Sequence, residues 1–402
     1  MRDDPKHLTR LLAVLALLAG LGTAAPLRAD PVAEILECPS VDFTACPALL
    51  AAQAKKAEPI KALADVLRDA KASPVHKVRA SQALSLLDAR DEKDAVAAAA
   101  EALRGDPLQV DLLVSSARLG DARAVRPLLE TMQHKDPRAC ILAAGALALL
   151  KAREAVPALV QALKADDQPR LQAAAAYALG LIGDIGAEPD LLDLAAKPRI
   201  YVPTRVQALD ALASLKSKRA VVLATLLIDS ASRDIGRAAL RLLTAVPTPW
   251  AEPAVVFALD TPGLRGEAGR AAQAMGLQHL GQKLIATVVR DDLDADERQW
   301  LLNALAKMKP QGAAPALAHR LKAAPSADEK LRIVRAIPEF GDRTVVPDLI
   351  ALLRGDDTAL VNQAVFALES LTGRNLGGDV QAWLAYEAGA AQPLAPGAAI
   401  PK

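Results

Sequence analysis

The sequence predicts an all-α fold in which pairs of helices repeat along the chain and stack into a solenoid. Hydrophobic residues make up 52% of the 402 residues, but aromatic residues make up only 2%. The apolar content is therefore mostly Ala, Leu and Val, which suits closely packed helices and leaves few alternating runs of the kind that form strands. A motif that returns at a steady spacing indicates the solenoid.

The motif marks the first helix of each repeat. It is clearest as Ala175-x-x-Ala178-Leu179, and complete or weaker copies end at positions 84, 116, 147, 179, 212, 242, 275, 305, 337 and 368. Successive copies are 30 to 33 residues apart. Positions i, i+3 and i+4 share one face of a helix, so each copy presents an Ala–Ala–Leu stripe to its neighbours.

A second helix follows the stripe after a short turn. Gly183-Asp184, Gly120-Asp121 and Gly341-Asp342 provide a residue that ends the first helix and a cap for the next one. Pro then opens the second helix, as in VPALVQAL and VPDLIALL, because its missing N–H has no partner in a first helical turn. The unit is helix, turn, helix, turn in about 31 residues.

This pattern resembles the HEAT-repeat α-solenoids, and in particular the short, Ala-rich subtype named after phycobilisome lyase subunits. The order A-x-x-A-L, G-D, V/E-P-x-L-x-x-A-L covers about residues 44–387, although the copies at Ser116 and Leu242 lack the Ala-Leu pair. The resemblance implies a right-handed α-solenoid, or superhelix, of about 11 HEAT-like helix pairs. We do not extend lyase activity to this chain, because those lyases attach bilins inside cells and this chain is predicted to be exported.

The N-terminus has the three parts of a secretory signal peptide: basic residues, an apolar segment and small residues. The apolar segment has about 15 residues, fewer than the roughly 20 of a membrane-spanning helix. We expect cleavage after Ala29 and a mature chain in the bacterial periplasm or secreted, with no membrane span; an uncleaved anchor is the alternative. The expected parts are a signal peptide (1–29), an N-terminal segment (30–43), the repeat solenoid (44–387) and a disordered tail (388–402).

Cysteine and aromatic residues predict how the two ends of the stack are closed. Cys38 and Cys46 are near enough in sequence to close a small loop, and exported chains meet an oxidising compartment. We therefore predict a Cys38–Cys46 disulfide that pins the N-terminal segment over the first repeat. Trp383 and Tyr386 are predicted to cover the last repeat, and Cys140 is interpreted as a small buried side chain rather than a nucleophile.

The sequence contains no recognisable signature of catalysis. The four histidines after the signal lie in separate repeats and lack metal-ligand spacing, and neither a P-loop nor a GxSxG motif occurs. A G-x-x-G-x-x-G run from Gly180 lies between helices without a preceding strand, so we interpret it as packing and turn. The acidic run DDLDADE from Asp291 lacks EF-hand spacing, and we favour a capping role for it over calcium binding. We expect no catalytic residue, cofactor or metal.

Arginines recur near the start of the first helices. They would form either a basic ladder for an acidic partner or pairs with the turn aspartates, and we favour the pairs. The arginines concerned are Arg79, Arg138, Arg170, Arg205, Arg237, Arg270, Arg298 and Arg332. A net charge of +1 and no basic stripe with interleaved aromatics argue against nucleic acid as a partner.

These observations favour a non-enzymatic protein–protein interaction scaffold of the bacterial cell envelope. We expect the second helices to line a concave face, the usual binding surface of solenoids, and to bind a protein or peptide there. The outward candidates are Lys61, Asp65, Arg126, Asp190 and Asp348. The alternatives are an enzyme, or a lyase-like accessory subunit of one, acting on an exported substrate, and a cell-surface adhesive module.

Overall fold

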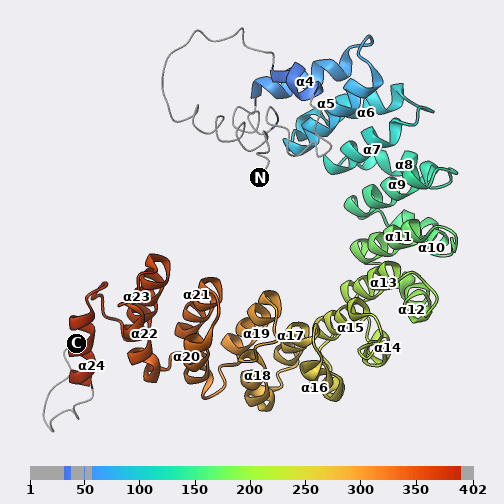
Figure 1. The fold of residues 1–402 in the computed structure, drawn as a ribbon. Coiled ribbons are helices and arrows are strands. Elements are labelled where there is room, and N and C mark those ends of the chain that lie inside the picture. Colours follow the sequence, from blue (N-terminus) through green and yellow to red (C-terminus); the bar gives the residue numbers. More distant parts are fainter. Residues whose placement is uncertain (1–30, 38–48, 50–56, 391–402) are drawn as a thin grey trace, which may run out of the picture. The chain divides into compact units, whose positions relative to one another are not determined.

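The computed structural model describes residues 31–37, 49 and 57–390, which fall into two units, residues 1–131 and 132–402, treated separately below (Figure 1). The described residues form α-helices and short 3-10 helices, with no strand among them. The predicted all-α solenoid is confirmed. The expected signal peptide, Cys38, Cys46 and residues 391–402 of the tail lie outside the described residues.

Unit 1 contains six described α-helices. They are α2 (Pro31–Leu36), α4 (Ala57–Arg68), α5 (Pro74–Leu86), α6 (Lys93–Ala102), α7 (Gln109–Arg118) and α8 (Val125–Thr131), with the 3-10 helices η2 (Arg90–Glu92) and η3 (Ala122–Ala124). The short helix α2 packs on α4 and α5. Its Ile35 is fully buried, and the Arg79 guanidinium of α5 donates a hydrogen bond to the Leu36 carbonyl. The described part of the N-terminal segment therefore packs on the helix pair α4–α5.

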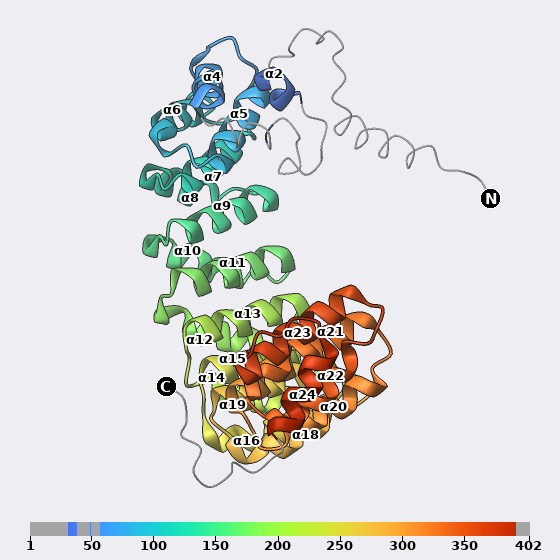
Figure 2. The same cartoon turned by 90° about the vertical axis from the view of Figure 1, so that its left-hand side faces the viewer.

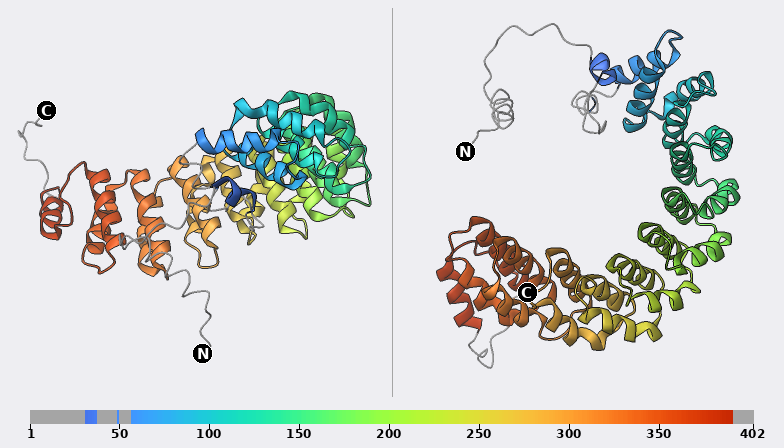
Figure 3. Two further views of the ribbon diagram at one scale, coloured as in Figure 1. Left: turned by 90° about the horizontal axis from the view of Figure 1, so that it is seen from above. Right: turned by 45° about the vertical axis from the view of Figure 1, so that its right-hand side comes forward.

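The described part of unit 2 contains eight helix pairs, and Figures 1 and 3 show successive pairs side by side in sequence order. Its first helices are α9 (Pro137–Leu149), α11 (Pro169–Ile182), α13 (Val202–Ser214), α15 (Arg233–Ala245), α17 (Arg265–Ala274), α19 (Ala295–Met308), α21 (Ala327–Ala336) and α23 (Thr358–Thr372). Its second helices are α10 (Val156–Leu163), α12 (Glu188–Ala196), α14 (Ala220–Leu227), α16 (Glu252–Asp260), α18 (Gly281–Val288), α20 (Ala313–Ala323), α22 (Val346–Leu352) and α24 (Val380–Ala390). Single 3-10 turns precede several second helices; these are η4 (Arg153–Ala155), η5 (Ile185–Ala187), η6 (Pro249–Ala251), η7 (Gln278–Leu280) and η9 (Arg343–Val345), while η8 (Ile337–Phe340) extends α21.

The Ala–Ala–Leu stripe lies in the core, as the sequence predicts. In α11, Ala175, Ala178 and Leu179 are fully buried, and α11 packs on both α9 and α13. The next residue, Gly180, lies so close to α13 that a Cβ there would be 2.8 Å from the Cα of Ala211. Small side chains therefore allow neighbouring first helices to approach one another.

The turns between the helices of a pair are built from local backbone chemistry. Gly183 ends α11 with φ of 77°, a conformation that costs glycine little, and the Asp184 carboxylate accepts a hydrogen bond from the Gly186 N–H at 2.8 Å. Where glycine is missing, a longer residue takes the same left-handed conformation, as Lys151 does with φ of 50°. The predicted Gly-Asp turn is thus confirmed at this repeat.

The first helices, rather than the second, lie on the inner side of unit 2. Consecutive first helices such as α11 and α13 pack on each other far more extensively than consecutive second helices such as α10 and α12. Figure 1 shows the first helices from α11 to α19 on the inner side of the row and the second helices from α10 to α18 on its outer side. Figure 2 shows α10 and α12 on one side of α9, α11 and α13. The expectation that second helices line the concave face is wrong in unit 2, because a row bends toward the side whose members are closest together.

The last helix, α24, closes unit 2. Trp383 is fully buried, its Nε1–H donates to the Gly377 carbonyl at 2.8 Å, and Tyr386 meets its ring edge-on at a centroid distance of 5.9 Å. The helix ends at Ala390, three residues beyond the expected end of the solenoid. None of the described helices is long and apolar enough to cross a membrane.

Candidate functional site

The five residues predicted to bind a partner lie on second helices, three of them in unit 1 and two in unit 2. Lys61 and Asp65 are exposed on α4, Arg126 is exposed on α8, and Asp190 and Asp348 are half-buried on α12 and α22. Four of the five form ion pairs, which are Asp65–Arg68 (3.4 Å), Arg126–Glu130 (3.5 Å), Asp190–Lys164 (3.4 Å) and Asp348–Lys322 (2.7 Å). Within unit 2, the structure places Asp190 and Asp348 in separate repeats on the outer layer.

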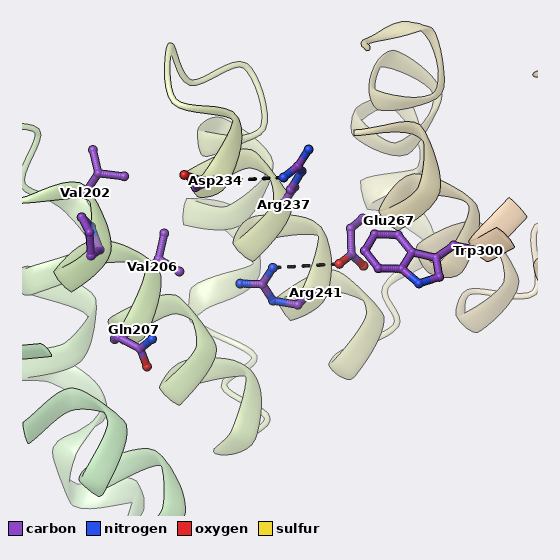
Figure 4. A pocket seen from close by; sticks show the side chains of 9 residues that line it. Val202, Val206, Gln207, Asp234, Arg237, Arg241, Glu267 and Trp300 are labelled. Atoms are coloured by element: carbon purple, nitrogen blue, oxygen red, sulfur yellow. Dashed lines mark ion pairs between the residues drawn. The ribbon is translucent and has the colours of Figure 1, made fainter. Parts of the chain in front are cut away.

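An open pocket of about 360 Å³ lies instead on the first helices of unit 2. It spans four consecutive first helices, α13, α15, α17 and α19 (Figure 4). Its lining residues are Val202, Pro203, Val206, Gln207, Asp234, Arg237, Arg241, Glu267 and Trp300. We call these residues the charged pocket. Each of the four repeats contributes one helix to the charged pocket, so the pocket exists only where these repeats stack.

Arg241 of α15 forms ion pairs with carboxylates on both neighbouring first helices at the charged pocket. Its Nε and Nη2 donate to the two carboxylate oxygens of Asp210 on α13, each at 2.8 Å, and its Nη1 lies 3.9 Å from Glu267 Oε1 on α17. A bidentate arginine–carboxylate pair fixes the relative orientation of the two side chains as well as the distance between them. One guanidinium therefore links three successive first helices.

Glu267 is the buried carboxylate of the pocket. Only 4% of its side chain is exposed, and Arg270 Nη1 donates to its Oε2 at 3.2 Å. Burial raises the pKa of the Glu267 carboxyl, and the neighbouring guanidiniums of Arg270 and Arg241 counteract part of that effect. Its Oε1 makes no hydrogen bond among the described residues and faces the Arg241 guanidinium at 3.9 Å.

Trp300 forms an aromatic wall opposite the aliphatic residues of α13. Its ring packs where Gly266 leaves room on α17, since a Cβ on Gly266 would lie 2.7 Å from Trp300 Cε3. The Arg270 guanidinium lies 5.6 Å from the centre of the Trp300 ring, within the range of a cation–π contact. Figure 4 shows Trp300 beside Glu267, with Val202 and Val206 on the far side of Arg241. Apolar walls around fixed charges suit the binding of a mixed apolar and charged segment.

Exposed apolar side chains occur on α9 and α11, the two first helices that precede α13 in the row. Leu149 of α9 and Tyr177 of α11 are each 53% exposed, and Leu181 of α11 is 41% exposed. Leu149 and Leu181 both lie two residues after the leucine of their stripes, so they occupy equivalent positions on two directly packed helices. Val206 of α13, half-buried at the pocket, is on the next first helix, about two turns nearer the start of its helix than Leu149 and Leu181 are in theirs. We call these four residues the apolar strip.

The repeated arginines have a structural role that neither sequence interpretation included. The buried Arg205 donates from Nε to the Ala195 carbonyl at 2.9 Å, and Arg298 donates to the carbonyls of Val288 and Arg290. These carbonyls lie at or just after the end of the preceding second helix, where backbone acceptors lack helical partners and the helix dipole is negative. The predicted pairing with turn aspartates is therefore wrong for Arg205, whose bond is to the backbone.

The acidic run from Asp291 is tied to arginines. Asp292 accepts hydrogen bonds from Arg290 and from the buried Arg265, and Arg320 pairs with Asp291. The guanidiniums of Arg290 and Arg265 hold the pKa of the Asp292 carboxyl below its usual range. Asp294 caps α19 by accepting from the Glu297 N–H at 2.7 Å, in the capping role that the sequence favours. Among the described residues, no His, Cys, Asp and Glu are grouped so that they could hold a metal ion.

A weak signal for this site is present in the sequence. The residue two positions before the leucine of each stripe faces away from the second helices; it is Tyr177 in α11 and Asp210 in α13. Arg237 and Arg241 are four residues apart, so they also share one face of their helix. Reading these outward positions across repeats would have found the pocket.

Comparison with known proteins supports the architecture. A family model of HEAT repeats matches residues 111–179 and 125–210. No curated protein matches the sequence. Among solved structures, the complex of CpcE and CpcF of phycocyanin lyase from Nostoc sp. PCC7120 is 19% identical, with a TM-score of 0.38 over 61% of this chain and 94% of that chain.

The karyopherin Kap121p is similar in fold over more of the chain. It is 12% identical with a TM-score of 0.50, covering 87% of this chain and 46% of Kap121p. Kap121p bound to Nup53p gives the same identity and TM-score over 82% of this chain and 46% of that chain. This chain thus spans less than half the length of Kap121p, and identities this low show the fold alone. Together with the helix pairs of the structure, the family match identifies the chain as an α-solenoid that contains HEAT repeats.

Proposed function

We propose that the chain is a non-enzymatic scaffold that binds a protein or peptide on the first helices of unit 2. The observation that carries the proposal is the charged pocket, to which four consecutive first helices contribute, with the apolar strip on α9, α11 and α13. Exposed apolar side chains grouped beside fixed charges are typical of surfaces that bind another protein. Kap121p, a solenoid of similar fold, binds Nup53p, so a protein partner is compatible with this architecture.

The proposed location is the bacterial cell envelope. The support is the signal-like N-terminus described from the sequence, and the location is open to direct measurement. Fractionation of the native cells should recover the protein with periplasmic markers, and its N-terminal residue should be Asp30. A cytoplasmic protein that retains Met1 would contradict the proposed location without affecting the proposed binding face.

The binding face can be tested by placing a photo-crosslinking amino acid at Tyr177. The matched control carries the same amino acid at Asp193 of the outer helix α12, whose side chain is 65% exposed, in the same repeat. Irradiation of the full chain in native cells should give a discrete protein adduct from position 177 and none from position 193. Equal adducts from both positions, or an adduct from position 193 alone, would show that the first helices are not the binding face.

A further inference from the structure

The apolar strip belongs to a part of the first-helix face that carries no charge. Between Ile141 and Leu149 of α9, and between Leu171 and Ile182 of α11, there is no Asp, Glu, Lys or Arg. Ala173 and Ala174 are partly exposed and small, so Tyr177 and Leu181 stand out above their surroundings. A charged side chain of a partner would lose water here without gaining a counter-charge. This part of the face therefore selects apolar side chains.

The first-helix face becomes positively charged at α15. Arg237 and Arg241 are one helical turn apart and face the pocket beside Val206, with 39% and 33% of their side chains exposed. Arg237 is oriented by a hydrogen bond from its Nε to the Gly263 carbonyl at 2.7 Å. Its two Nη atoms make no hydrogen bond among the described residues. The apolar strip thus ends at a fixed guanidinium whose outer N–H groups remain available.

The carboxylates around these arginines are already engaged to different degrees. Both carboxylate oxygens of Asp210 accept hydrogen bonds from Arg241 in a bidentate pair, and the buried Glu267 accepts a hydrogen bond from Arg270. Asp234 is the exception, at 69% exposed, and its carboxylate lies 3.8 Å from Arg237 Nη1 without a hydrogen bond. An exposed pair of this kind contributes little in water, so a better-placed carboxylate of a partner can replace it.

Basic groups without an ion pair continue along the same layer beyond the pocket. Arg335 of α21 and Lys307 of α19 are exposed and form no ion pair within the described part of the chain. Among the carboxylates, Asp328 of α21 is paired with Arg332 at 2.9 Å, and Asp296 at the start of α19 is exposed without an ion pair. From α15 to α21 the available groups on the first helices are therefore weighted toward donors. An acidic segment complements this charge, and a basic segment does not.

We propose that the partner presents an extended segment in which apolar side chains are followed by acidic ones. The apolar residues cover Leu149, Tyr177 and Leu181, and the first acidic side chain accepts hydrogen bonds from the Nη atoms of Arg237, beside Val206 and Arg241. This inference rests on the proposed function and names the chemistry of its partner. It also gives the segment a direction, from α9 toward α15.

The test uses three short fluorescein-labelled peptides and the full chain without its signal peptide, with binding followed by fluorescence anisotropy. In the first peptide a block of Leu and Phe precedes a block of Glu; the second has Lys in place of Glu; the third has Ser in place of Leu and Phe. We expect the first peptide to bind at least about tenfold more tightly than either of the others, and to lose affinity as salt is raised.

Two variants locate the contacts. Arg237→Gln should weaken binding of the Glu peptide about tenfold and leave the Lys peptide unchanged, whereas Arg237→Lys, which keeps the charge, should retain most of the preference. Arg219→Gln, at an exposed arginine before the outer helix α14, is the matched control and should have no effect. Tyr177→Ser should weaken the Glu and Lys peptides by the same factor. Circular dichroism of each variant shows that it is folded.

The outcomes separate this inference from the proposed function. Binding of the Lys peptide as tight as that of the Glu peptide, no response to Arg237→Gln, or no binding of any peptide would overturn the inference about partner chemistry. The proposed function would stand in each of these cases if the crosslinker at position 177 still captured a native partner. Loss of that adduct would overturn the proposed function itself.

Discussion

A glycine-to-alanine substitution should lower the stability of the fold in α11 and raise it in the adjacent first helix α9. Gly180 of α11 faces α13, and a Cβ there would lie 2.8 Å from the Cα and 3.0 Å from the Cβ of Ala211. Gly145 of α9 has no atom within 4 Å of the position of a Cβ. Both residues are in helices with ordinary backbone conformation, so the same substitution is compared in two different surroundings.

The change in the free energy of unfolding combines the higher helix propensity of alanine with the cost of any steric clash. Alanine in place of glycine stabilises a helix interior by about 0.5–1 kcal/mol, and Gly145→Ala should gain that amount. At Gly180 the clash is partly with backbone, which cannot swing aside as a flexible side chain can, and overpacking of this kind costs about 1–3 kcal/mol. After the helix term is subtracted, Gly180→Ala should lower the free energy of unfolding by roughly 0–2.5 kcal/mol, with a central value of about 1 kcal/mol.

The assay is urea unfolding of the chain without its signal peptide, followed by circular dichroism at a helical band. Because long repeat arrays can unfold in parts, the comparison is of transition midpoints for the variants and the wild type under identical conditions. Gly180→Ala should lower the midpoint and Gly145→Ala should raise it. If Gly180→Ala raised the midpoint as much as Gly145→Ala, the close approach of α11 and α13 would not exist as described.

Four further predictions follow from single sites. Trp383→Ala should cost about 3–5 kcal/mol and increase hydrogen exchange in α23 and α24, because a fully buried ring and its hydrogen bond are lost; unchanged exchange would contradict its role in closing unit 2. Arg205→Ala should lower the free energy of unfolding by about 1–3 kcal/mol in urea titrations, since a buried carbonyl loses its donor. The folded-state pKa of Glu267 lies above the ordinary value of 4.5, so the protonated side chain contributes its full stability below pH 4.5 and loses it as the pH rises through the folded-state pKa. The free energy of unfolding of the wild type, relative to that of Glu267→Gln, should therefore fall as the pH rises through this range. A rise would contradict the upward direction of the pKa shift. Intact mass after alkylation, with and without reductant, should show one Cys38–Cys46 bridge and one further thiol, and three thiols alkylated before reduction would exclude the bridge.

The repeat architecture was predictable because it depends on contacts that are near in sequence. A stripe at i, i+3 and i+4 must lie on one helical face, and Gly-Asp followed by Pro can end one helix and begin another wherever it occurs. These local rules place Ala175, Ala178 and Leu179 in the core before any tertiary structure is known. Repetition then implies that each unit packs on a copy of itself.

The role of individual charged residues was not predictable in the same way. Arg205 and Arg237 are near the start of their helices and look alike in the sequence, yet one is buried and bonded to Ala195 while the other is partly exposed at the pocket. Arg205 meets a carbonyl of α12, the second helix before its own, whereas Arg237 meets the Gly263 carbonyl after α16, the second helix that follows its own. Which of the two ends lies within reach of a guanidinium is set by packing between helices, which the spacing of the motif does not describe.

The sequence by itself therefore determined the helix pairs, their order and the stripe that buries them, because period and turn chemistry act over a few residues. Only the tertiary structure decided which layer of unit 2 faces inward. The slim, Ala-rich first helices pack closest, so the row bends toward them and brings Asp210, Arg241, Glu267 and Trp300 together from four repeats. A site assembled from single residues about 31 positions apart has no local pattern, and its chemistry depends on the distance between neighbouring helices.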